Sequence, residues 1–91
     1  MREWLMNKVT FTDRAWSDYL YWQTQDKKTL RRVNALIDDI KRNGNEGIGK
    51  PEALVGDLSG FWSRRIDGQN RIIYRITDDV IEFVGLRKHY E

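Results

Sequence analysis

The chain contains no cysteine, only one histidine and one proline, and no hydrophobic run long enough to cross a membrane. Without cysteine no disulfide can form, and a single histidine cannot complete the Cys and His ligand set of a structural zinc site. The N-terminus shows no charged start followed by an apolar stretch, which a secretory signal would need. We therefore expect a cytoplasmic protein that makes no contact with a membrane.

An excess of charge of either sign is also lacking, because 16 basic and 14 acidic residues leave a net charge of only +2. The overall charge therefore says little about partners. With 40% hydrophobic and 33% charged residues, the composition is that of an ordinary globular protein. Its 91 residues suffice for one modest core. We expect one domain over residues 1–91, in which residues 1–7 are an N-terminal extension.

The most informative stretch runs from residue 58 to residue 76. Two segments rich in β-branched and aromatic residues flank an Asp-Gly break and predict a β-hairpin. Because side chains alternate along a strand, one face of this hairpin is predicted to meet the core and the other to meet solvent. The predicted core face consists of Trp62, Arg64, Ile66, Ile72, Tyr74 and Ile76. The predicted open face consists of Ser63, Arg65, Arg71, Ile73 and Arg75.

This choice of faces fixes the pairing of the two strands. It requires an odd number of connecting residues, for example three residues with Gly68 in a left-handed conformation and a bulge. A loop of two or four residues would separate Arg65 from Arg71. We expect the odd loop, which gathers Arg65, Arg71 and Arg75 on a face with no acid in either strand. Such a face suits a phosphate-rich ligand, although arginine on an exposed strand can also serve only to keep a sheet soluble.

The other elements follow from periodicity and capping residues. A short strand is predicted at residues 8–11, and a helix from Asp13 to about Gln23 with Thr12 as its N-cap. A second helix is predicted to begin after Asp26, to carry an Asp38–Arg42 pair and to end at Asn43-Gly44. Residues 45–57 are predicted to form a loop, Asp78-Asp79 a tight turn, and Val80 to about Leu86 a last strand. The helices' predicted core residues are Ala15, Trp16, Tyr19, Leu20, Gln23, Leu30, Val33, Ile37 and Ile40.

These elements predict an α+β fold with a mostly antiparallel twisted sheet and two N-terminal helices packed as an antiparallel pair on one face. Metal-independent RNA cleavage needs a base for the ribose 2′-OH, cationic donors for the phosphate and an acid for the leaving 5′ oxygen. One set of candidates has Glu52 as the base, Arg65 and Arg71 as the phosphate clamp, His89 as the acid and Tyr90 as a stacking or hydrogen-bonding neighbour. Taken singly, each of these residues is as readily an ordinary surface residue.

Metal and nucleotide chemistry are less well supported. Asp78, Asp79 and Glu82 could suggest a divalent cation, but Asp-Asp between two strands is first of all a turn. The segment Gly47-Ile48-Gly49-Lys50-Pro51 follows a helix and leads into no new one, so it is not a nucleotide-binding loop. We therefore expect no metal and no cofactor.

Several motifs across the chain resemble the YoeB/Txe family of bacterial toxins, within the RelE/ParE superfamily. The central motif of nine residues is specific, whereas the Thr-Asp-Asp turn alone would not be. Together the motifs span nearly the whole chain. They are Trp16–Gln23, Gly49–Glu52, Leu58–Ile66, Asn70–Tyr74, Thr77–Asp79 and His89–Tyr90.

The resemblance implies a microbial-ribonuclease-like fold and an endoribonuclease that cuts messenger RNA in the ribosomal A site. Such a toxin inhibits translation and is held inactive by a cognate antitoxin, and a homodimer is also possible. The resemblance further implies that Glu52 is the general base, Arg71 the phosphate-stabilising arginine, His89 the general acid and Tyr90 the terminal tyrosine. Arg65 matches a supporting basic residue. With Lys50, Arg75 and Lys88 it completes the predicted substrate-binding set.

Two other functions remain open on the sequence. The same fold could serve as a non-catalytic ParE-like toxin, in which the Glu, Arg and His set is absent. It could also be an RNA-binding module that uses tryptophan and arginine on its sheet. Such a module would tolerate the loss of Glu52 and His89.

Overall fold

The computed structural model describes residues 8–88 of the chain. Its elements in chain order are β1 (Lys8–Phe11), α1 (Asp13–Gln23), α2 (Lys27–Asn43), β2 (Glu52–Ala53), a 3₁₀ turn (Gly56–Leu58), β3 (Trp62–Arg65), β4 (Arg71–Thr77) and β5 (Val80–Gly85). Within this described part, no helix is long and apolar enough to span a bilayer.

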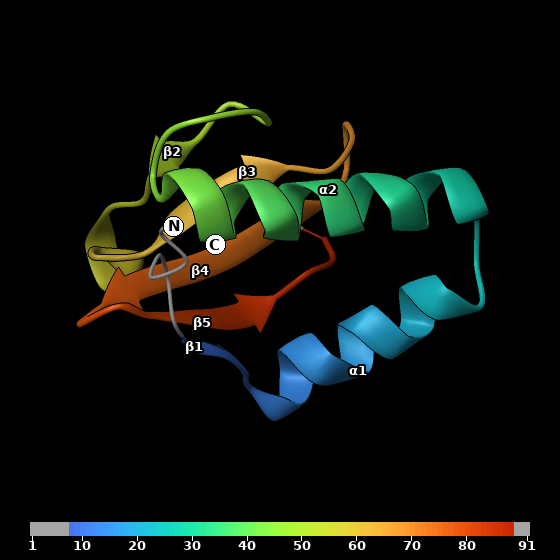
Figure 1. Ribbon diagram of the computed structural model, residues 1–91, viewed down its shortest axis with the longest axis horizontal. Helices are drawn as coiled ribbons and strands as arrows, with labels where there is room; N and C mark the ends of the chain where they lie inside the picture. Colours follow the sequence, from blue (N-terminus) through green and yellow to red (C-terminus); the bar gives the residue numbers. More distant parts are fainter. Residues whose placement is uncertain (1–7, 89–91) are drawn as a thin grey trace.

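The strands form one five-stranded sheet in the order β1-β5-β4-β3-β2 (Figure 1). Among the strands of residues 8–88, only β1 pairs in parallel, with β5, and the other three pairings are antiparallel. The last two strands are joined by a turn in which both Asp78 and Asp79 have positive φ, as the twist of a two-residue hairpin demands. The predicted α+β class and the predicted Asp78-Asp79 turn are therefore confirmed.

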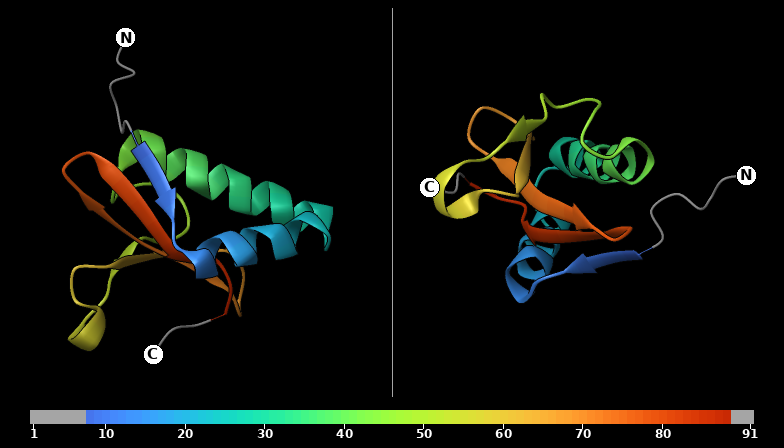
Figure 2. Two further views of the ribbon diagram at one scale, coloured as in Figure 1. Left: turned by 90° about the horizontal axis from the view of Figure 1, so that it is seen from below. Right: turned by 90° about the vertical axis from the view of Figure 1, so that its left-hand side faces the viewer.

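Both helices lie where capping residues predicted them. The Thr12 hydroxyl accepts a hydrogen bond from the Ala15 amide, and the Asp26 carboxylate accepts one from the Lys28 amide. Figure 2 shows the two helices joined by a short break and running in opposite directions beside the sheet, as predicted. Their buried residues form a single core with the inward side chains of the strands. The apolar face of the hairpin thus meets the helices, and the opposite face is left for the site.

The predicted core face of α1 is partly wrong. Trp16 and Leu20 are about half exposed, at 48% and 49%, whereas Asp18 and Trp22 are buried with Ala15. The buried face is the one that meets the end of β5, where polar bonds fix the rotation of the helix. The Leu86 amide donates to the Asp18 carboxylate over 2.9 Å, and the Trp22 indole donates to the Leu86 carbonyl over 2.7 Å. In α2 the prediction missed Leu36, which is fully buried.

The β3–β4 register is as predicted, with Arg65 directly opposite Arg71, but the loop is built differently. Gly68 does not have the predicted positive φ. Instead the Asp67 carboxylate accepts hydrogen bonds from the amides of Gln69 and Asn70, both at 2.8 Å, which closes the turn without a left-handed residue. The register shift lies between β4 and β5, at Ile73 and Tyr74, and not in this hairpin.

The open face of the hairpin is not uniformly solvated, contrary to the prediction. Ser63 is fully buried and Ile73 is only 2% exposed. Both lie in the interior of the sheet, with Ser63 paired to Glu52 and Ile73, and Ile73 paired to Ser63 and Gly85. The face therefore has a buried floor, and its charged residues stand at the rim.

Candidate active site

The site is assembled by two antiparallel pairings at the β2 side of the sheet. Glu52 in β2 lies opposite Ser63, and Arg65 at the end of β3 lies opposite Arg71 at the start of β4. Residues opposite each other share a face, and so do residues two apart on one strand. Glu52, Arg65 and Arg71 therefore project from the same side. The Arg71 Nη1 atom lies 3.8 Å from Glu52 Oε1.

This pair is loosely held. The Glu52 side chain is 66% exposed and the Arg71 side chain is 20% exposed. At 3.8 Å the two groups attract each other without a well-formed hydrogen bond, so the pair contributes little to folding. Like charges directly opposite on neighbouring strands, as in Arg65 and Arg71, repel each other. An anion placed between the two guanidinium groups would relieve that repulsion.

Neither strand of the hairpin carries an acid, as predicted, but acids reach the arginine face from the flanking strands. Glu52 comes from β2, and Glu82 in β5 lies opposite Arg75 with Oε1 3.0 Å from Arg75 Nε. The Arg75 guanidinium also lies 4.9 Å from the centroid of the Phe61 ring. Arg75 stands four residues beyond Arg71, roughly 13 Å along the strand. It is therefore engaged by Glu82 and Phe61 and lies well away from Arg71.

The remaining predicted residues fall into two groups. Lys50 and Lys88 are exposed and both have positive φ, 52° and 65°. Lys50 follows Gly49, whose carbonyl accepts a 2.7 Å hydrogen bond from the Arg65 amide, so it borders the site. His89 and Tyr90 lie outside the described residues.

The segment after β5 is held by hydrogen bonds from α1 and from residues 70 and 71. Asp18 and Trp22 bind the amide and the carbonyl of Leu86, as described above. The Lys88 amide donates to Asn70 Oδ1 over 2.7 Å, and the Lys88 carbonyl accepts from the Arg71 amide over 3.2 Å. The chain thus leaves the described region beside Arg71.

Asp18, Trp22 and Asn70 were given no role by sequence reasoning. For Asp18 a signal was available, because it is an acid on the same helical stripe as Ala15 and Trp22. A polar group on a buried stripe requires a partner. Asn70 offered no comparable signal, since asparagine after Asp-Gly first suggests a turn.

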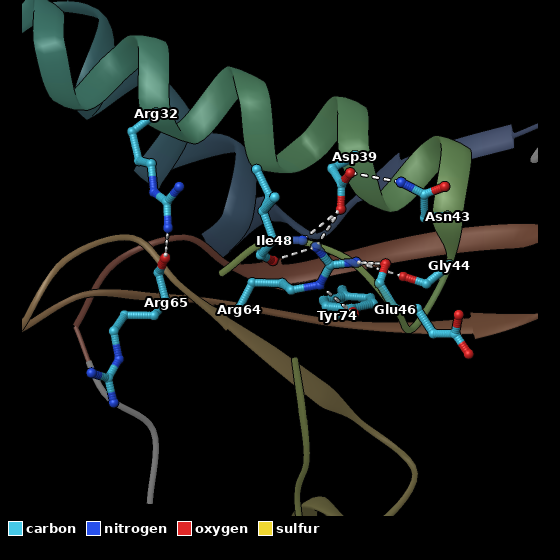
Figure 3. A network of polar contacts seen from close by, with 9 residues as sticks. All are labelled: Arg32, Asp39, Asn43, Gly44, Glu46, Ile48, Arg64, Arg65 and Tyr74. Atoms are coloured by element: carbon cyan, nitrogen blue, oxygen red, sulfur yellow. Dashed lines mark hydrogen bonds and ion pairs between the residues drawn. The ribbon is translucent and has the colours of Figure 1, made fainter. Parts of the chain in front are cut away.

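Arg64 belongs to the fold and not to the phosphate surface, which confirms its place on the predicted core face of the hairpin. Figure 3 shows Arg64 and Arg65 pointing to opposite sides of β3. The Arg64 side chain is fully buried. Its guanidinium donates to the carbonyls of Gly44, Glu46 and Ile48 at 2.7, 2.9 and 2.6 Å. It also donates to the Asp39 carboxylate at 2.7 Å and to the Tyr74 hydroxyl at 3.2 Å.

These contacts shift two pKa values. Burial alone would raise the pKa of Asp39, but hydrogen bonds from Arg64, Asn43 and the Ile48 amide outweigh it and hold that pKa below its ordinary value. Burial raises the pKa of Tyr74, and the Arg64 charge only partly opposes this. Tyr74 is therefore a neutral phenol and Asp39 a carboxylate at neutral pH. The loop of residues 44–48 is tied to α2 and β3 just before the segment that carries Glu52.

Gly49 gives a direct test of how closely this loop approaches the core. Its φ is +82°, and an added Cβ would lie 2.6 Å from Leu36 Cδ2. We expect Gly49→Ala to lower the free energy of unfolding by about 2 kcal/mol, from left-handed strain and crowding together. Gly56 has φ +69° and open space around it. Gly56→Ala should therefore lower the free energy of unfolding by about 1 kcal/mol, from strain alone. Gly68 has neither a positive φ nor a close neighbour, so Gly68→Ala should change the free energy of unfolding little. Equal urea midpoints for all three variants would contradict this account.

The arrangement can bind an anion and supply a base beside it. Arg65 and Arg71 project from the same side of the sheet, and an exposed carboxylate lies 3.8 Å from the Arg71 guanidinium. Within residues 8–88, no three His, Cys, Asp or Glu side chains are grouped so that they could hold a metal ion. The groups on hand are those of acid and base chemistry on a phosphodiester.

Comparisons with known proteins give the family. The model of the YoeB-like toxin of bacterial type II toxin-antitoxin systems matches residues 11–90. Toxin YoeB of Streptomyces coelicolor is 51% identical over 83 residues, which cover 91% of this chain and 99% of the relative. Toxin YoeB of Escherichia coli K12 is 47% identical with the same coverage.

Solved structures agree with this result. The YoeB/ParE toxin from Agrobacterium tumefaciens superposes with a TM-score of 0.88 at 40% identity, covering 92% of this chain and all of the other. YoeB from the Staphylococcus aureus YoeB-YefM complex gives a TM-score of 0.83 at 42% identity, covering 91% of this chain and 97% of the other. YoeB toxins are ribosome-dependent endoribonucleases that act on messenger RNA. With both its sequence and its fold matched over nine-tenths of its length, the chain belongs to the YoeB-like toxins of bacterial type II toxin-antitoxin systems.

Proposed function

We propose that this toxin cuts messenger RNA at the β2 side of its sheet, with Glu52, Arg71 and His89 as the reacting groups. The observation that supports this most is the Glu52–Arg71 pair, a carboxylate 3.8 Å from a guanidinium on a face shared with Arg65. A base and a cation at this separation can serve the nucleophile and the phosphate of one nucleotide.

In the proposed reaction Glu52 removes the proton from the ribose 2′-OH, and the 2′ oxygen attacks the adjacent phosphorus. Arg71 and Arg65 bind the phosphate oxygens, on which negative charge builds up. His89 donates a proton to the 5′ oxygen as its bond to phosphorus breaks. The products are a 2′,3′-cyclic phosphate and a free 5′-OH. Tyr90 is proposed to stand beside His89, and Lys50, Arg75 and Lys88 to bind the RNA backbone.

Regulation is proposed to use the same face. The S. aureus relative forms a complex with YefM, and a YoeB dimer from the same organism is also known. For this chain we propose an antitoxin with an acidic segment, initially disordered, that covers the Arg65–Arg71 face. A homodimer stays a prediction. Since the substrate is messenger RNA on the ribosome, the toxin is proposed to act in the cytoplasm.

Arg71→Ala tests the proposed phosphate clamp. Loss of one preorganised donor to the developing charge should slow cleavage about 10²-fold. Arg75→Ala should have a smaller effect, because Arg75 is engaged by Glu82 and Phe61. Arg42→Ala, on an exposed helix surface, should have none. Primer extension on a translated messenger, before and after adding toxin, measures the cuts.

The same assay separates the other functions. A non-catalytic ParE-like toxin would leave the messenger intact. An RNA-binding module would block translation without new 3′ ends and would keep this effect in Glu52→Ala and His89→Ala. New ends within codons that vanish in Arg71→Ala support the proposed nuclease.

A further inference from the structure

Ser63 lies on the floor of the site with a hydroxyl group that lacks a partner. The residue is fully buried. Among the residues that the structure describes, its Oγ is one of two buried side-chain polar atoms that make no hydrogen bond. The other, Asn45 Oδ1, lies in the loop that Arg64 holds. Buried polar groups are nearly always satisfied, so an exception calls for a physical reason.

The fold gives no reason for a hydroxyl at this position. An unpaired buried hydroxyl destabilises the folded state relative to an apolar group of similar size. Alanine would fit the same strand position, since it only removes the oxygen. If the Ser63 oxygen is needed, it must make its hydrogen bond in another state of the protein, such as the one with RNA bound.

The neighbours of Ser63 point to that state. Glu52 is directly opposite on β2, and Arg65 lies two residues further along β3 on the same face. Side chains opposite each other in an antiparallel pair have Cβ atoms about 4.5–5.5 Å apart, within the reach of a glutamate that rotates about its side-chain bonds. The Glu52 carboxylate is 66% exposed and loosely paired with Arg71, so rotation is not prevented.

We propose that the Ser63 hydroxyl donates a hydrogen bond to the Glu52 carboxylate when Arg71 turns from Glu52 to the phosphate of bound RNA. This inference rests on the proposed function, in which Glu52 is the base. When Arg71 turns away, the carboxylate loses the ion pair that it makes at 3.8 Å. Ser63 supplies a donor from below and aims Glu52 at the 2′-OH. Ser63 is thus a positioning residue that acts through Glu52.

Ser63→Ala should lower kcat about tenfold and leave KM unchanged, since only the aim of the base is lost. The acidic limb of the pH–rate profile should move to higher pH, because a hydrogen bond to a carboxylate lowers its pKa and the variant lacks that bond. The variant leaves unchanged the charged residues that border Glu52 in the described part of the chain, which are Lys50, Arg65 and Arg71. The urea midpoint should stay the same or rise.

Ser63→Cys keeps the size of the side chain with a weaker donor and should fall between wild type and Ser63→Ala. Ser59→Ala, which alters an exposed serine next to the 3₁₀ turn, should match wild type. In a Glu52→Gln background, Ser63→Ala should cause no further loss. A wild-type rate and pH profile for Ser63→Ala, or a lowered urea midpoint, would overturn the inference. If Glu52→Gln itself cleaves normally, the proposed base is wrong, which is a separate result.

Discussion

We expect Glu52→Gln to slow cleavage of messenger RNA by about 10²- to 10⁴-fold, the range that general acid and base catalysis contributes. The amide keeps the shape of the side chain and its place opposite Ser63. It cannot accept the 2′-OH proton. Binding should stay equal or become tighter, because the anion that lies 3.8 Å from Arg71 no longer competes with the RNA phosphate. Single-turnover cleavage on programmed ribosomes, with binding measured separately, gives both quantities.

Glu46→Gln is the matched control for this variant. It removes the same charge from the same connecting segment, but Glu46 takes part in the structure through its backbone carbonyl, which accepts from Arg64. Its rate should equal that of wild type. A similar loss in both variants would mean that the negative charge of the segment matters and not a base at residue 52. A Glu52→Gln variant with full activity would exclude Glu52 from proton transfer.

The parts of this site that could be predicted were those set by alternation and by turns. Placing Ile72, Tyr74 and Ile76 inward forced Arg71 outward, and parity then placed Arg65 opposite Arg71, as observed. Local rules were enough because each strand offers only two faces. Thr12 and Asp26 fixed the helix starts in the same way, through hydrogen bonds made within three residues.

The parts that could not be predicted depend on contacts between distant residues. Trp16 was expected in the core and Trp22 was not. Because α1 has aromatic residues on several sides, periodicity alone could not decide which of the two tryptophans is buried. The bonds of Asp18 and Trp22 to Leu86, 68 and 64 residues away, decide the matter. The ion pair between Glu52 and Arg71 was likewise not predicted. Strand β2, which carries Glu52, is two residues long and has no alternating pattern that would reveal it.

Arg64→Met should lower the free energy of unfolding by about 3–5 kcal/mol, the cost of breaking a buried ion pair by removing one partner. The variant leaves the Asp39 carboxylate without its cation and the carbonyls of Gly44, Glu46 and Ile48 without their donor. Arg64→Lys should lower the free energy of unfolding by less, because lysine keeps the charge but has three donors in place of five. Urea denaturation followed by tryptophan fluorescence measures the differences.

Two neighbouring acids on α2 provide the control. Asp38 pairs with Arg42 at 3.2 Å, but both side chains are exposed, at 57% and 70%. Asp38→Asn should therefore change stability by less than about 0.5 kcal/mol. Asp39 pairs with the fully buried Arg64 and is itself only 17% exposed. Asp39→Asn keeps the shape and loses the charge, and we expect a loss of about 2 kcal/mol. Equal effects of the two substitutions would contradict a buried role for the Arg64 pair.

The same pair makes stability depend on pH in a defined direction. Because the pKa of Asp39 is lower in the folded chain than in the unfolded one, where it is about 3.9, the carboxylate stabilises the fold above that pH. This contribution is lost as the pH falls toward the folded pKa. The stability gap between wild type and Asp39→Asn should thus be full at neutral pH and should narrow once the pH falls below about 4, because protonation removes from Asp39 the same charge that the substitution removes. Urea titrations of both proteins across this pH range measure the gap, and a gap that stays constant would show that the charge of Asp39 does not support the loop.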